Sequence, residues 1–351
     1  MQGLEVPESV LSAWGLDGST TSPLGSGLIN RTWLVTAGTG PGSRRYVLQQ
    51  VNPIFPPEVN EDIQVVAAHL RSRGLTAPEL LPTRDGRLWL PDPGGAYRLM
   101  THVAGVSRDR LANAAEAREA GDLLGHFHRA LDGLRHEFRN GRPGVHDTAR
   151  HLGVLRQALE EHRAHRDFAA IRPIADEILQ LAAALPPLPV VRDRIVHGDP
   201  KINNLLFDAE TNRALCFIDL DTLGPMPLPL ELGDAFRSWC NPVGEDRRDG
   251  AFALDLFTAA IDGYAAATAG WITPAESGAV VAGTLTIYVE LAARFCADAL
   301  RESYFGWDST RFPSRSAHNQ ARAASQLTAA RSLWDVRSAA EEVVRRAFGS
   351  G

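Results

Sequence analysis

The sequence predicts an α+β fold with two lobes, a small β-rich N-terminal lobe and a large helical C-terminal lobe. Residues 28–35 and 44–51 are β-rich and flank a turn-forming segment, which is typical of a hairpin. From about residue 110 onward, apolar residues recur mainly at helical spacing. Short apolar strands with polar ends interrupt these helices between residues 193 and 221. This distribution favours two structurally different parts.

The N-terminal part contains further predicted elements. Its one helix ends at Gly74, a residue type that commonly follows a helix C-terminus. The elements are a helix over 58–74, a hairpin over 80–91 that turns at Asp85-Gly86, and a strand over 96–105. We therefore expect an N-terminal lobe over residues 1–102 and a C-terminal lobe over residues 103–351.

The C-terminal part is read as mostly helical. Its predicted helices cover residues 111–134, 150–165 and 174–185, segments after residue 250, and an Ala/Arg-rich last helix over about 317–347. The island between residues 193 and 221 supplies three short strands, in the stretches RDRIVHGD, NNLLFD and ALCFIDLD. We expect a hairpin that carries functional groups within this island.

Composition narrows the class of protein. The chain has 351 residues, 44% of them hydrophobic and 22% charged, as in ordinary globular proteins. The net charge of −6 argues against nucleic acid or an anionic membrane as a partner, because both attract basic surfaces. The N-terminus lacks a signal-peptide pattern, and no apolar run reaches about 18 residues. We expect a cytoplasmic monomer or homodimer, with its three cysteines as small buried side chains.

Polar residues gather in the stretch IVHGDPKINNLLFD, residues 195–208. His197-Gly198-Asp199 is followed five residues later by Asn204, and Asp219 and Asp221 follow after one short pair of strands. The protein-kinase template has H-R-D-x-x-x-x-N followed by a second acidic site. The spacing therefore predicts a two-lobe protein-kinase-like fold.

Phosphoryl transfer explains these residue types. Asp199 could act as the base beside the acceptor hydroxyl, and Asn204, Asp219 and Asp221 could supply oxygen ligands to Mg²⁺ on the phosphates of ATP. Two carboxylates about 4 Å apart repel by roughly 4 kcal/mol at an effective dielectric constant near 20, so converging acids would need a cation. The alternative is that these are turn residues that close two hairpins, since Asp, Asn and Gly all favour turns.

A glycine pair precedes the first strand. Gly25-Ser26-Gly27 could bring backbone N–H groups close to phosphates, although a plain turn is the alternative. No G-x-x-x-x-G-K-[ST] motif occurs, so the sequence excludes a P-loop protein.

The expected phosphate-binding lysine is missing from the second hairpin strand. Gln49 stands at that place, while Glu61 on the predicted helix could be the acidic partner or could lie on a solvated face. Lys201 or Arg45 could supply the missing positive charge.

With Asp199, Asn204 and Asp219 in place, the chain resembles the aminoglycoside phosphotransferase-like kinases, in which HGD replaces the H-R-D of protein kinases. It is more closely similar to the N-acetylhexosamine 1-kinases over blocks that run from Gly25 to Leu327. These blocks are GSGLINRTWLV, YVLQQVN, NEDI, KINNLLFD, ALCFIDLDTLGPMP, LGDAFRSWCNP, ARFCADALRESYF and HNQARAASQL.

The resemblance implies an ATP- and Mg²⁺-dependent kinase of the anomeric hydroxyl of N-acetylated hexosamines. It implies Asp199 as base and Asn204 and Asp219 as metal ligands, and it gives Asp234 a structural role in holding the catalytic loop. The other residues that it implies are Gln49 near the nucleotide, Met100 to His102 at the adenine, and Asn30, Arg31, Arg294 and Tyr304 near the sugar.

Other acceptors and one other class of protein stay open. Aminoglycoside, homoserine and choline are alternative acceptors, although Arg294 and Arg322 suit a neutral or partly anionic sugar better than a cation. A protein kinase is not supported, because neither A-P-E nor D-F-G is present. A non-catalytic nucleotide-binding module is the alternative outside the enzymes, motivated by Gln49.

Overall fold

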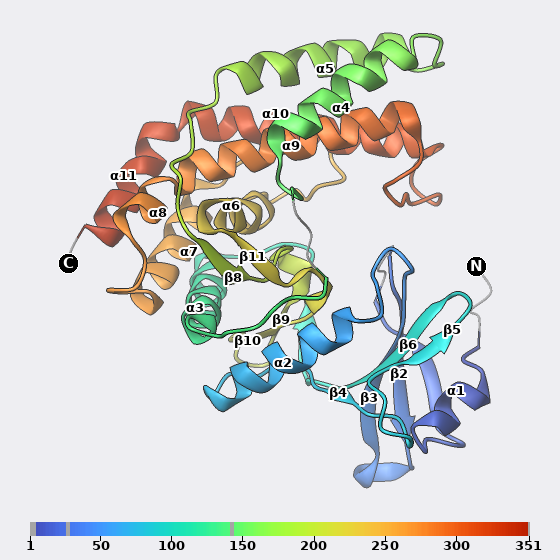
Figure 1. The fold of residues 1–351 in the computed structure, drawn as a ribbon. Coiled ribbons are helices and arrows are strands. Elements are labelled where there is room, and N and C mark those ends of the chain that lie inside the picture. Colours follow the sequence, from blue (N-terminus) through green and yellow to red (C-terminus); the bar gives the residue numbers. More distant parts are fainter. Residues whose placement is uncertain (1–4, 26–28, 141–143, 350–351) are drawn as a thin grey trace. The chain divides into compact units, whose positions relative to one another are not determined.

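The computed structural model describes residues 5–25, 29–140 and 144–349, which divide between two compact units (Figure 1). The first unit comprises Met1–Ala104, Gly133–Gly141 and Ile218–Leu223, and the second comprises the rest. Antiparallel sheets and many helices confirm the predicted α+β class. Two short segments from later in the chain join the first unit, whereas the sequence analysis assigned them to the C-terminal lobe.

An antiparallel sheet forms most of the first unit, in the order β1-β2-β3-β6-β4. The predicted hairpin is confirmed, since β2 and β3 pair from Arg31↔Gln50 to Ala37↔Arg44. Trp33, Val35 and Leu48 bury one face of this hairpin. The elements of this unit before α2 are α1 (Glu8–Ala13), β1 (Thr20–Pro23), β2 (Arg31–Ala37), η1 (Gly40–Gly42) and β3 (Arg44–Val51).

The second predicted hairpin is wrong, although its turn is present. β4 (Leu80–Leu81) and β5 (Leu90–Asp92) do not pair with each other; both pair with β6 (Gly95–Thr101). The chain does turn near Asp85-Gly86, where the N–H of Gly86 donates to the carbonyl of Thr83. The sequence contains the turn signal, but both short strands pair with β6, so the chain turns here without forming a hairpin.

The predicted N-terminal helix is α2 (Val59–Ser72). It buries Val59, Ile63, Val66 and Leu70, which recur at helical spacing. Gly74 follows the end of the helix at φ +81°, a left-handed conformation that glycine adopts without a steric penalty.

Helices dominate the second unit. They are α3 (Ala114–Leu131), α4 (Thr148–Glu161), α5 (Phe168–Ala183), α6 (Leu228–Trp239), α7 (Leu254–Ala267), α8 (Pro274–Gly278), α9 (Val280–Arg301), α10 (Arg315–Asp335) and α11 (Arg337–Phe348). The predicted last helix is thus two helices, because the chain bends at Val336. In Figure 1, α4, α5 and α10 lie against α9, and these four helices share one hydrophobic core.

Helix α9 has 22 residues and is long and apolar enough to cross a membrane by length and composition. The sequence analysis did not single it out, because polar residues interrupt its apolar stretches. The most apolar 18-residue stretch of this helix is 89% buried inside the protein, as in the core helix of a globular fold.

Short strands form two small sheets in the second unit. The three predicted strands are β8 (Asp193–Val196), β9 (Leu205–Phe207) and β10 (Ala214–Phe217). β9 pairs with β10 as a hairpin and also with β7 (Val106–Ser107), whereas β8 pairs with β11 (Gly224–Pro227), which was not predicted. The three cysteines are free and buried, as expected.

Glycines allow α3 and α7 to pack at backbone contact. A Cβ atom at Gly121 would lie 2.0 Å from the carbonyl oxygen of Ala260, and one at Gly263 would lie 2.1 Å from that of Arg118. A Cβ at Gly153, on the exposed side of α4, would meet no atom within 4 Å.

We expect Gly121→Ala to lower the free energy of unfolding by about 1–3 kcal/mol through overpacking. Gly153→Ala is the matched control and should raise it by about 0.5–1 kcal/mol, because alanine loses less backbone entropy in a helix. Urea denaturation measures both, and equal effects of the two substitutions would show that α3 and α7 do not pack at this distance.

Candidate active site

Helix α6 holds the loop that contains Asp199. The buried carboxylate of Glu231 accepts hydrogen bonds from the backbone N–H groups of His197 and Gly198, both at 3.0 Å. Gly198 has φ +80°, so the backbone turns here in a conformation that favours glycine. The turn between β8 and the loop is therefore fixed by one acid of the helix.

Two more residues of α6 bind the same loop. The indole N–H of Trp239 donates to the carbonyl of Pro200 at 2.8 Å, and the N–H of Ile202 donates to the hydroxyl of Ser238 at 3.0 Å. Asp234, which was expected to hold the loop, pairs with Arg237 on its own helix at 2.8 Å. Burial raises the pKa of Asp234, and Arg237 opposes this effect.

Asp199 lies in a cluster of donors within the loop. Its Oδ2 accepts from Lys201 Nζ at 2.5 Å and from Asn204 Nδ2 at 3.2 Å, while Nδ2 also donates to the Asp199 carbonyl at 2.9 Å. Burial would raise the pKa of Asp199, but the Lys201 ammonium outweighs this and holds the pKa below its usual value. Asp199 is thus a carboxylate at neutral pH, and its neighbour Asn204 is fixed through the amide nitrogen.

A buried ion pair organises the polar part of the first unit. Arg98, on β6, binds Asp221 through two nitrogen–oxygen contacts of 2.5 and 3.0 Å, and both side chains are 1% exposed. Asn30 donates to the same carboxylate at 2.7 Å, and Asn140 donates to the Asp221 carbonyl at 2.8 Å. Both oxygens of Asp221 therefore accept from protein donors, and its expected role as a metal ligand stays a prediction.

Gln49, which stands where a lysine was expected, belongs to the same cluster. Gln49 lies opposite Arg98 in the sheet register, and its side-chain oxygen accepts from Arg98 at 2.9 and 2.7 Å. Its amide nitrogen donates to Thr32 at 3.1 Å, and Asn60 lies 3.3 Å from Arg98. Gln49 therefore binds the buried Arg98 of the neighbouring strand, and the choice of Lys201 or Arg45 as the phosphate-binding cation stays a prediction.

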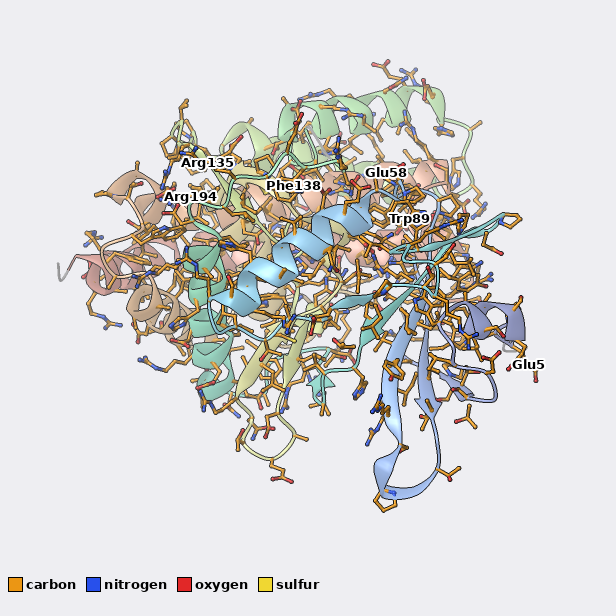
Figure 2. All side chains as sticks on the ribbon, turned by 60° about the horizontal axis from the view of Figure 1, so that its bottom comes forward. Glu5, Glu58, Trp89, Arg135, Phe138 and Arg194 are labelled. Atoms are coloured by element: carbon orange, nitrogen blue, oxygen red, sulfur yellow. The ribbon has the colours of Figure 1, made fainter. Side chains whose placement is uncertain are left out.

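Helix α2 contributes a different acid from the expected one. Glu61 is nearly half exposed and lies 3.5 Å from Arg139. Its neighbour Asp62 is buried and accepts from His136 at 2.7 Å and from the backbone N–H groups of Arg139 and Asn140. Figure 2 shows the labelled Phe138 beside α2, in the segment that Asp62 binds. Asp62 thus attaches residues 133–141 to the first unit.

Asp219 has an unusual backbone. Its φ of 61° and ψ of 54° are left-handed, which few residues other than glycine adopt without strain. It directly precedes η3 (Leu220–Thr222), the turn that carries Asp221 into the Arg98 cluster. Strained residues of this kind cluster at functional sites, and aspartate tolerates the conformation better than most.

The second unit contains a pocket of about 500 Å³ between α4, the end of α9 and the residues that follow α9. Arg294 and Tyr304, expected near the sugar, both line it. Arg322 does not: it binds Asp246 at 3.0 Å and the carbonyl of Gly306 at 2.9 Å.

The other expected site residues lie in the first unit. Arg31 is exposed and contacts Gln50 at 3.4 Å, and Met100 pairs with Val47 in the sheet. Burial, with help from the exposed Arg45, lowers the pKa of His102, so this side chain is neutral at pH 7. Gly25 has φ +77°. Ser26 and Gly27 lie outside the described residues, so the phosphate-loop prediction stays a prediction.

Residues 20–269 match the model of the APH phosphotransferase enzyme family. The chain belongs to this family. The match covers the sheet of the first unit and the loop with Asp199 and Asn204.

Curated relatives are homoserine kinases. That of Pseudomonas aeruginosa is 30% identical over 174 residues, which are 49% of this chain and 51% of the relative. That of Cupriavidus pinatubonensis is 27% identical over 240 residues, 66% of this chain and 68% of the relative. The chain thus spans about half the length of the first of these relatives.

Solved structures share the fold over nearly the whole chain. A microcompartment-associated aminopropanol kinase has a TM-score of 0.62 at 16% identity, covering 95% of this chain and 97% of its own. An aminoglycoside phosphotransferase from Alicyclobacillus acidocaldarius also has a TM-score of 0.62 at 16% identity, covering 97% and 98%. These similarities show the predicted two-lobe protein-kinase-like fold.

Sequence reasoning missed the residues that organise the site. Arg98, Asn60 and Asn140 meet their partners across long separations in the chain, and Glu231 was not singled out. One signal was available: Arg98 is a charged residue within the otherwise apolar strand AYRLM. A lone charge on a buried strand indicates a buried partner.

We expect Arg98→Met to lower the free energy of unfolding by about 3–5 kcal/mol, because it leaves the Asp221 carboxylate buried without its cation. Arg44→Met, at an exposed position of β3, is the control and should change it by less than about 0.5 kcal/mol. Adding Asp221→Leu to Arg98→Met should recover part of the loss in urea denaturation. A loss below about 1 kcal/mol for Arg98→Met would contradict the pairing.

Proposed function

We propose that the protein transfers the γ-phosphoryl group of ATP to a hydroxyl of a small molecule. The observation that carries this proposal is the loop from His197 to Asn204, in which Asp199 and Asn204 have the spacing of a phosphotransferase and are held together by direct hydrogen bonds. Membership of the APH phosphotransferase enzyme family supports the same reaction.

Asp199 is the residue that orients the acceptor hydroxyl and takes its proton. Its lowered pKa keeps it ionised, so it always presents an acceptor oxygen to the alcohol. Lys201 binds this carboxylate and, in our proposal, also contacts the phosphates. The rigid attachment of the loop to α6 positions Asp199 for attack, which is where phosphotransferases gain most of their rate.

Asn204 and Asp219 are the proposed magnesium ligands. Carboxylate and carboxamide oxygens suit Mg²⁺, which typically takes one or two protein ligands together with substrate phosphates. Asn204 fits because its amide nitrogen is bound to Asp199, and no hydrogen bond to its side-chain oxygen occurs among the described residues. When bound, Mg²⁺ neutralises charge that develops on the phosphates. Asp221 is the third proposed ligand, and its oxygens also accept from Arg98 and Asn30.

The acceptor is proposed to be a sugar or amino sugar that binds in the pocket with Arg294 and Tyr304. The resemblance to N-acetylhexosamine 1-kinases supports the anomeric hydroxyl of an N-acetylhexosamine as the reacting group. The homoserine kinases among the relatives support a second candidate, a small hydroxyl-bearing amino acid. For the nucleotide, we keep Gly25-Ser26-Gly27 and the Met100 to His102 backbone as proposed contacts.

We expect Asp199→Asn to lower kcat by at least about 10²-fold, the lower end of what general base catalysis contributes. Glu210→Gln, an exposed acid on the following turn, is the control and should leave kcat unchanged. ADP release with a panel of sugars, homoserine and choline measures the effect. Unchanged turnover in Asp199→Asn would overturn the assignment, and ATP binding without turnover of any acceptor would favour a non-catalytic nucleotide-binding module.

We also expect Asp219→Ala to abolish magnesium-dependent binding of ATP, because the metal loses its carboxylate ligand. Asp109→Ala, at an exposed position, should bind like the wild type. Calorimetric titration with ATP, with and without Mg²⁺, gives the difference. Magnesium dependence that survives in Asp219→Ala would assign the metal to other residues.

A further inference from the structure

The pocket with Arg294 and Tyr304 is rich in guanidinium groups. Arg150, Arg294 and Arg301 line it, together with one acid, Asp298, and one imidazole, His151. Arg150 comes from the first turn of α4, and the other two arginines lie about two turns apart at the end of α9. All of these residues belong to the second unit.

The one acid that lines the pocket, Asp298, already accepts hydrogen bonds from protein groups. Asp298 is buried and accepts from the backbone N–H groups of Ser303, Tyr304 and Phe305 at 2.8–2.9 Å. Asn319 donates to it at 2.9 Å. Asp298 therefore fixes the turn after α9 and offers no free oxygen to a ligand, although its charge remains.

The arginines differ in how far their charge is compensated. Arg294 is 3.8 Å from the buried Glu290, which also binds His146 and Thr148, each at 2.8 Å. Arg301 pairs with Glu161 at 3.3 Å. Arg150 is exposed, lines the pocket and makes no side-chain ion pair among the described residues.

The pKa of His151 is affected by the same positive charges. Burial lowers its pKa, and although the Val145 carbonyl and Glu290 oppose this, Arg294 and Arg150 lower it further. The imidazole is thus neutral at pH 7 while the guanidinium groups keep their charge. A cationic acceptor would meet like charge in this pocket.

Buried charged groups lie near both Asp199 and the pocket. Asp199 interacts electrostatically with Arg237, which pairs with Asp234 at 2.8 Å, and Asp234 in turn interacts with His146. His146 binds Glu290, the acid beneath Arg294. The proposed base and the pocket thus each have buried charged groups of the second unit near them.

We propose that this pocket selects acceptors that carry an anionic oxygen group, a carboxylate or a phosphate, and that Arg150 binds that group. A guanidinium matches either group with two parallel charge-assisted hydrogen bonds. Val145, Val154 and Phe305 supply the apolar wall beside the charges. The inference rests on the proposed function, because it names the acceptor of that same site, and it excludes choline-type and aminoglycoside acceptors.

The experiment compares binding of four probes to the whole protein at constant ionic strength: N-acetylglucosamine, N-acetylglucosamine 6-phosphate, glucuronic acid and choline. Calorimetry should give Kd values at least about tenfold lower for the two anions than for the neutral sugar, with no binding of choline. The two anionic probes distinguish phosphate from carboxylate as the preferred group. Equal affinity for the neutral and anionic sugars, or binding of none of the probes, overturns the proposal.

Arg150→Gln assigns the effect to the pocket. It should raise the Kd for the preferred anion at least about tenfold and leave that for N-acetylglucosamine unchanged. Arg345→Gln, an exposed arginine on α11 that pairs with Glu342, is the matched control and should change neither value. An unchanged Kd for the anions in Arg150→Gln overturns the role of this residue.

ADP release with the same probes separates this inference from the proposed function. Turnover of neutral sugars with no advantage for anions would keep the kinase and overturn the anion selectivity. Anion binding that depends on Arg150, but without ADP release from any acceptor, would keep the pocket assignment and overturn the kinase.

Discussion

The buried pair between Arg98 and Asp221 is the interaction on which the first unit depends. It joins a strand of the N-terminal sheet to a turn that follows 123 residues later in the chain. Without a cation, the Asp221 carboxylate could not stay buried, since an unpaired charge in the interior is far more costly than a paired one. The pair therefore decides to which unit residues 218–223 belong.

This arrangement gives neighbouring acids different tasks. The carboxylate of Asp221 accepts hydrogen bonds from Arg98 and Asn30. Asp219, two residues earlier, lies in a left-handed conformation at the start of the same turn. On α2 the division is similar, because Asp62 is buried in a structural contact and Glu61 faces solvent. Neighbouring acids that differ in burial and backbone conformation are thus separated by one or two positions.

The second unit fixes its functional groups from helices. α6 holds the Asp199 loop through Glu231, Ser238 and Trp239, and α9 supplies Arg294 to the pocket. Both helices pack in the same core, so the loop and the pocket have a common rigid support. A site built on packed helices keeps its geometry better than one on free loops, and this suits a reaction that depends on positioning.

The amino-acid sequence by itself determined the local features: the hairpin of β2 and β3, helix α2, and the Asp199–Asn204 spacing within one loop. These follow from periodicity and turn residues that lie close together in the chain. Three features followed only from the tertiary packing: Arg98 binds Gln49 and Asp221, β4 and β5 share β6, and Glu231 binds the Asp199 loop. The reason is physical: partners of buried polar groups are selected by packing across distant segments, and no local pattern encodes that choice.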